Sequence, residues 1–229
     1  MNNSNTTYFT VMSLGGSMSD LMQNLLKQNK NLSHCLRVVP THCGQRKISK
    51  VLDEIQKQSS SFIAIGFTGG VNSVVNIGDI IIPLKAYCIE TKEESIPNKE
   101  IASNLITFSW SFPSCIHHGI VWTSQHVIHA DSAEKDSLAK SNCLCVDMET
   151  YWLFSEAQKR SIQVAAVLIV SDHVFLQPLK SLCGCSNFLP QTAETIASVR
   201  EALEAAATVL RVHKPKKIEN NMDECVKKV

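Results

Sequence analysis

Long apolar runs are missing from this sequence. No segment reaches the roughly 18 consecutive apolar residues that a membrane-spanning helix needs. The first residues, MNNSNTTYF, also lack the basic and apolar regions of a secretory signal peptide. We therefore expect a protein with no membrane partner, and a cytoplasmic location follows by default.

A concentration of charge of one sign is missing too. The 229 residues include 22 Lys and Arg against 21 Asp and Glu, which leaves a net charge of +1. Because binding to a phosphate backbone needs a concentrated basic face, this balance argues against nucleic acid as a partner. A short basic stretch near the end of the chain is interpreted as a solvated polar tail. Its members are Arg211, His213, Lys214, Lys216 and Lys217.

The CxxC spacing of common zinc sites is absent, although nine cysteines are a high and odd count. Two CxC pairs occur, at 143–145 and 183–185, and the first falls in an expected strand. In a reducing compartment such cysteines are buried small hydrophobes or free thiols. The histidine pairs 117–118 and 126–129 have no carboxylate or cysteine that completes a clear ligand set. We therefore expect no metal site.

What the chain does contain is a mixture of helical and strand patterns. Helices are expected at 17–28, 48–58, 149–160 and 196–210, and strands at 8–14, 36–39, 62–65, 77–83, 119–123, 143–146 and 164–170. The polar residues 89–104 are expected to form a loop or excursion. Because several strands are apolar throughout, the pattern predicts an α/β protein, a three-layer α/β/α sandwich with helices on both faces of the sheet. We expect a single domain over 1–229, with an ordered core at about 8–212.

A glycine-rich segment follows one of the buried strands. It reads Ile65-Gly-Phe-Thr-Gly-Gly-Val-Asn72, and a Gly-Asp strand entry at 78–79 comes soon after. Glycines at a strand end let a ligand approach the main chain closely. An ordinary turn with permissive glycines would have the same sequence, so this segment alone decides nothing.

Two further segments place carboxylates at strand ends. Cys145-Val-Asp-Met-Glu-Thr150 opens a helix, where Glu149 could bind ribose hydroxyls and Met148 could pack under the sugar. A glutamate in a first helical turn also suits a cap favoured by the helix dipole. In Ile169-Val-Ser-Asp-His173 a buried strand ends in Ser171-Asp172, at the end where α/β sheets bind ligands. A lone aspartate there is also common as a helix cap or turn former.

Together the three segments resemble the nucleoside phosphorylase and nucleosidase superfamily. That family has a strand ending in a GxxGG-like turn, then a Gly-Asp strand, a (D/E)-Met-Glu helix start and a Ser-Asp after a buried strand. All four features occur here in that order, and the resemblance covers roughly residues 8–212. It implies a nucleoside phosphorylase-like fold with a mixed central sheet, no cofactor, and a purine nucleoside of the adenosine type as the small-molecule partner.

The resemblance also implies roles for individual residues. Asp172 would protonate the purine at N7, with Ser171 orienting it, and a positioned acid is worth roughly 10²- to 10⁴-fold in rate. To act near neutral pH, Asp172 must be buried enough to raise its pKa. Glu149 would accept hydrogen bonds from the ribose 2′- and 3′-hydroxyls, and Met148 would pack on the sugar. Gly69, Phe67 and Ile128 would line the substrate site, where Val127 or Ile128 stands in place of an aromatic residue of many members.

The departures from the family pattern concern the nucleophile. Phosphorylases of this family hold phosphate with arginines, one of them two residues before the first glycine of the turn, where Ala64 stands here. The loop 15–20 has no arginine either, and only Arg46 lies nearby. Nucleosidases use a carboxylate in that first loop to activate water, and the matching position is Asp20 or Ser19. Ser17-x-x-Asp20 is equally typical of a helix capping box.

We therefore expect hydrolysis of the N-glycosidic bond, with Asp172 and Asp20 as catalytic residues. The alternatives are a phosphorylase that uses phosphate as co-substrate, or a variant that acts on a 5′-substituted adenosine, as in hopanoid synthesis. A third alternative is an inactive nucleoside-binding relative, although retention of both Glu149 and Asp172 argues against it. The family further implies a homo-oligomer, with a dimer favoured for a nucleosidase.

Overall fold

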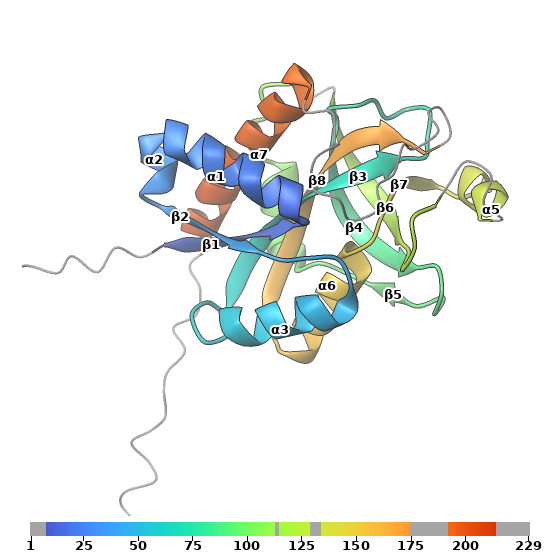
Figure 1. Ribbon diagram of the computed structural model, residues 1–229, viewed down its shortest axis with the longest axis horizontal. Helices are drawn as coiled ribbons and strands as arrows, with labels where there is room; N and C mark the ends of the chain where they lie inside the picture. Colours follow the sequence, from blue (N-terminus) through green and yellow to red (C-terminus); the bar gives the residue numbers. More distant parts are fainter. Residues whose placement is uncertain (1–7, 113–114, 129–133, 175–191, 214–229) are drawn as a thin grey trace, which may run out of the picture.

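The computed structural model describes residues 8–112, 115–128, 134–174 and 192–213 (Figure 1). The strands are β1 (Phe9–Leu14), β2 (Leu36–Pro40), β3 (Ser61–Gly70), β4 (Ile80–Cys88), β5 (Glu94–Ser95), β6 (Ile116–Thr123), β7 (Cys143–Asp147) and β8 (Gln163–His173). The helices are α1 (Gly16–Gln28), α2 (Lys30–Ser33), α3 (Gln45–Ile55), α4 (Lys99–Ile106), α5 (Lys135–Lys140), α6 (Thr150–Lys159) and α7 (Ala193–Val212).

Helices cover both faces of the sheet, as Figure 1 shows for α1, α2 and α7 on one side and α3 and α6 on the other. The central strands are buried on both faces because alternate apolar side chains point to opposite helical layers. Val11, Ile63 and Val167 pack toward α1 and α7, whereas Ala64 and Leu168 pack toward α3 and α6. The predicted three-layer sandwich with a mixed sheet is thus confirmed.

Five strands of the sheet form a closed circuit. β3 pairs with β8 in parallel, and β8 pairs with β4 in antiparallel fashion. β4 pairs with β6, and β6 with β7, both in parallel. A short antiparallel pairing of β7 with the last two residues of β3 completes the circuit. β1 and β2 extend the sheet from β3, and β5 extends it from β4.

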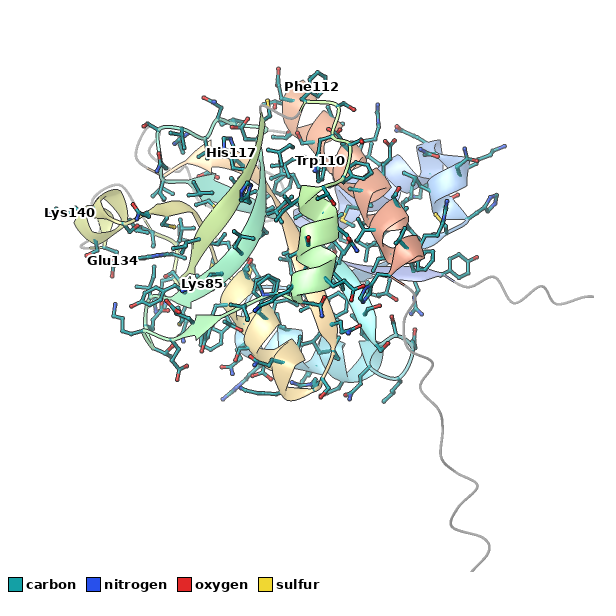
Figure 2. The ribbon with its side chains drawn as sticks, turned by 180° about the vertical axis from the view of Figure 1, so that it is seen from behind. Lys85, Trp110, Phe112, His117, Glu134 and Lys140 are labelled. Atoms are coloured by element: carbon teal, nitrogen blue, oxygen red, sulfur yellow. The ribbon has the colours of Figure 1, made fainter. Side chains whose placement is uncertain are left out.

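The prediction of a loop over residues 89–104 is wrong in its second half, where α4 begins. The Asn98 side chain accepts a hydrogen bond from the Ile101 amide at 3.0 Å and so caps this helix. Ile101 and Leu105 are fully buried, and Figure 2 shows α4 lying beside α7, with Trp110 beyond its end. The sequence pattern did not predict this helix because its apolar residues recur over a single turn and stand among polar residues.

The glycine-rich segment also differs from its prediction. Residues 66–70 continue strand β3 rather than forming a turn after it, with an irregularity between Thr68 and Gly69. Gly66 is required there because a Cβ at this position would lie 2.8 Å from the Leu14 Cβ. The chain turns instead at 76–79, where Asp79 accepts from the Asn76 amide at 2.9 Å and pairs with His117 on β6 (Figure 2).

Candidate active site

The three segments singled out in the sequence meet at Gly69. In the sheet, Gly69 lies opposite Val146 of β7 on one side and opposite Asp172 of β8 on the other. The Thr68 hydroxyl donates to the Val146 carbonyl at 2.9 Å and so ties β3 to β7. One short stretch of β3 therefore brings the Asp-Met-Glu segment and the Ser-Asp pair to the same place.

Asp172 is buried, and only one of its carboxylate oxygens has a partner. The Ser171 hydroxyl donates to Oδ1 at 2.7 Å, whereas Oδ2 has no hydrogen-bond partner among the described residues. Burial raises the pKa of Asp172, while the Ser171 hydrogen bond and the charge of His173 act in the opposite direction. A buried polar atom without a partner is costly, so Oδ2 is the atom of this carboxyl group that is free to meet a ligand.

Gly69 leaves the space next to that oxygen. A Cβ at residue 69 would lie 2.8 Å from the Val174 side chain and 3.5 Å from Asp172 Oδ2. A side chain here would displace Val174, whereas its contact with the unpaired oxygen would be an ordinary one. Glycine thus allows Val174 to pack against β3 next to the carboxyl group.

His173 does not share the environment of Asp172. Its ring Nε2 contacts the Val75 carbonyl oxygen at 2.6 Å, and successive side chains of a strand point to opposite faces. His173 therefore anchors the segment that follows β3, and its influence on Asp172 is limited to its charge.

Asp147 caps the helix that follows β7. It accepts hydrogen bonds from the Thr150 amide at 3.1 Å and from the Thr150 hydroxyl, and Thr123 of β6 donates to its Oδ1 at 2.8 Å. The sequence motif predicts no separate role for Asp147, although aspartate is a favoured acceptor for the backbone donors at a helix start. Glu149 is the N-cap residue of α6, but its side chain makes no capping hydrogen bond, so Asp147 provides the acceptor at this helix start.

Glu149 is only 6% exposed and has few partners. Its Oε2 accepts the Met148 amide at 3.1 Å, and the thiol of Cys43 hydrogen-bonds to the carboxylate. Burial, and then the nearby charge of Asp147, raise the pKa of Glu149 well above its usual range. Burial and the Glu149 charge likewise raise the pKa of Cys43 to about 12, so this thiol stays protonated and acts as a donor.

The remaining predicted substrate-binding residues lie at different depths. Met148 is half-buried next to Glu149, and Ile128 is buried in a small apolar cluster with Val146 and Val174. Because Val174 also contacts the position of Gly69, this cluster borders the Asp172 side of the site. Phe67 is half-buried and packs against the core beneath α1 and α7.

Asp20 lies apart from these buried groups. It is exposed on α1 and makes no hydrogen bond or ion pair with the described residues, whereas its neighbour Ser19 is buried. The capping-box interpretation of Ser17 and Asp20 is wrong, because the N-cap residue of α1 is Gly15 (φ 86°) and no side chain caps the helix. Asp20 therefore does not cap the start of α1.

Few groups in the described residues suit a metal or an anion. No set of three or more His, Cys, Asp or Glu side chains is arranged there to hold a metal ion, and His129 and the pair 183–185 lie outside those residues. Ala64 is fully buried in the core, and Arg46 is exposed on α3. Among helices in the same part of the chain, none is long and apolar enough to cross a bilayer.

Carboxylates at the ends of two strands, β7 and β8, thus meet beside the glycine end of β3 in an α/β sandwich. The chain belongs to the Phosphorylase superfamily, whose family model matches residues 39–211. The matched region contains all three segments, and the family predicted from them is confirmed.

Two known proteins illustrate the relationship. The chain is 30% identical over 121 residues to the DeoD-type purine nucleoside phosphorylase of Buchnera aphidicola subsp. Baizongia pistaciae (strain Bp), an alignment that covers 49% of this chain. It spans about half the length of that curated relative, 51%. The fold is similar to that of uridine phosphorylase from Vibrio fischeri ES114, solved with 6-hydroxy-1-naphthoic acid. The TM-score is 0.68 with 16% identity over 92% of this chain and 93% of the other.

Proposed function

We propose that this protein is an enzyme that cleaves the N-glycosidic bond of a purine nucleoside and releases the free base. The observation behind this assignment is the unpaired Oδ2 of Asp172, buried beside Gly69 while Oδ1 is held by Ser171. A carboxyl group with a raised pKa and one free oxygen suits proton donation to a leaving group in a dry site. Purine rather than pyrimidine specificity follows from the role of such a donor at N7, and the named purine nucleoside phosphorylase relative is consistent with it.

In the proposed reaction the glycosidic bond breaks and its electron pair passes to the base. The sugar becomes oxocarbenium-like, and the proton of Asp172 neutralises the charge that develops on the purine. Glu149 accepts hydrogen bonds from the ribose hydroxyls, with Met148 beside the sugar. Such bonds to a buried carboxylate are charge-assisted and therefore strong.

Water is the acceptor that we propose for the sugar. Asp147, Glu149 and Asp172 form no ion pair with a described Lys or Arg, and Ala64 offers no charge. A phosphate dianion placed near these carboxylates would lose its hydration without gaining a cationic partner. Water adds to the anomeric carbon and gives a proton to a base, for which Asp20 is the candidate. No cofactor takes part.

Phosphorolysis is the second candidate, and one electrostatic interaction favours it. The charge of Lys47, near the start of α3, acts on the Cys43 thiol that hydrogen-bonds to Glu149, and Arg46 precedes it. These two cations are candidate replacements for the arginines of phosphorylases. In that case phosphate would be the co-substrate, and ribose 1-phosphate the product.

The test is a screen of adenosine, methylthioadenosine, inosine and uridine in phosphate-free buffer, followed by addition of phosphate and identification of the sugar product. We expect free base and free sugar from a purine nucleoside at a rate that phosphate leaves unchanged. A strict phosphate requirement with sugar 1-phosphate as product would establish the second candidate. Absence of base release from every nucleoside would refute both. Glu149→Gln serves as a control, because it should impair ribosides more than 2′-deoxyribosides.

A further inference from the structure

Asp147 and Glu149 are two buried carboxylates at the start of α6, with one residue between them. They accept different numbers of hydrogen bonds. Asp147 accepts from both the amide and the hydroxyl of Thr150 and from the Thr123 hydroxyl. The Glu149 amide also points at Asp147 Oδ1, at 3.4 Å. Among the described residues, Glu149 itself accepts only from the Met148 amide and the Cys43 thiol. Both residues are 6% exposed.

The side-chain donors of Asp147 come from two elements, β6 and α6. Thr123 ends β6, and its hydroxyl also accepts the Tyr151 amide at 2.9 Å, so one side chain joins β6 to the first turn of α6. Thr150 is the first residue of the helix. Asp147 thus occupies the position at which a helix start needs an acceptor, and no second carboxylate is needed there.

We propose that Asp147 is a positioning residue for Glu149: by accepting the donors at the start of α6, it leaves the Glu149 carboxylate available to a ligand. Asp147 and Glu149 are both buried, and two like charges in one buried site oppose each other's ionisation. Protonation of Glu149 would remove the charge with which it binds ribose hydroxyls, so Asp147 sets the lower pH limit of ribose binding.

Other charged groups around the pair are few in the described residues. Cys43, from the loop before α3, faces Glu149, and Lys47 lies beyond that thiol. Cys143 and Cys145 of β7 are the titratable groups close to Asp147, and burial raises the pKa of both. Because these thiols are neutral near pH 7, Asp147 is the main charge that acts on Glu149.

Two substitutions separate capping from charge. Asp147→Asn keeps an oxygen that can cap the helix but removes the charge, so the titration midpoint of Glu149 should fall by about one pH unit. The midpoint is measured by carbon-13 NMR of labelled glutamate side chains, with the Glu149 signal assigned by its loss in Glu149→Gln. The acid limb of the pH profile of kcat/KM should move to lower pH by the same amount. Asp147→Ala removes cap and charge, and KM for ribosides should rise at least about tenfold with kcat changed much less.

Thr123→Val is the matched control, because it removes one donor to Asp147 but leaves the charge, and it should not lower the Glu149 midpoint. This role of Asp147 rests on the proposed function only in so far as Glu149 binds ribose. If the native protein cleaves no nucleoside, the proposed function fails, yet the NMR titration still decides the link between the two carboxylates. An unchanged Glu149 midpoint in Asp147→Asn would overturn the inference, and so would an unchanged riboside KM in an active Asp147→Ala variant.

Discussion

Two aspartates that the sequence assigns to the same reaction lie in opposite surroundings. Asp172 is held at the end of a central strand, with one oxygen fixed by Ser171 and the other buried and unpaired. Asp20 lies on the exposed surface of α1, without a partner among the described residues. The end of a buried strand removes water from a carboxyl group and fixes its direction, whereas a helix surface does neither.

The difference has a chemical meaning. Desolvation raises the pKa of Asp172, so it can keep a proton to donate. An exposed carboxylate such as Asp20 is surrounded by bulk water. We expect it to act as a base only when a bound substrate holds one water molecule next to it. We infer that the half of the site that protonates the base is built into the sheet, and that the half that activates the nucleophile depends on the bound complex. Three substitutions test this contrast.

The largest effect is expected from Asp172→Asn. The substitution keeps the shape of the side chain but removes the transferable proton, so kcat should fall at least about 10²-fold. Base release in single-turnover reactions measures it, and a thermal melt like that of the native protein serves as the control for folding. Near-normal turnover in a folded variant would remove Asp172 from the acid role.

A smaller loss, about tenfold, is expected from Asp20→Asn, because a solvated carboxylate contributes less than a positioned and desolvated one. Hydrolysis rates in phosphate-free buffer measure it. Glu54→Gln, which also removes an exposed helical carboxylate, is the matched control and should leave the rate unchanged. If Asp20→Asn is as active as this control, another group activates water; a loss equal to that of Asp172→Asn would erase the contrast between the two aspartates.

The smallest change in rate, but a defined shift in pH, is expected from Ser171→Ala. The acid must be protonated, so activity is present below the raised pKa of Asp172 and is lost as pH rises through it. The Ser171 hydrogen bond lowers that pKa, and its removal should therefore move the alkaline limb of the pH profile upward. Ser13→Ala removes a buried hydroxyl that has no partner among the described residues, and it should leave the limb in place. A downward shift in Ser171→Ala would show that another group forms the alkaline limb.

Periodicity predicted most of the strands and the long helices, because apolar residues there alternate or recur over several turns. It missed α4, whose start depends on one capping side chain, Asn98. It also placed Gly69 in a turn, since glycine-rich sequence does not distinguish a turn from a strand that must pass close to its neighbours. The family motif predicted roles for Glu149 and Asp172, but not that Asp147 accepts the donors at the start of α6. This arrangement depends on Thr123, which is distant in sequence and adjacent only in the fold.

The closed circuit of strands also bears on how the protein avoids sticking to other chains. A circuit has no free edge, so among the described strands only β2 and β5 end the sheet. β5 has two residues, one of them an exposed glutamate, and β2 carries an exposed arginine and ends at Pro40. Short length, charge and proline are the features that keep sheet edges from pairing with foreign strands. The strands that hold the carboxylates, β7 and β8, lie within the circuit and not at a sheet edge where aggregation could begin.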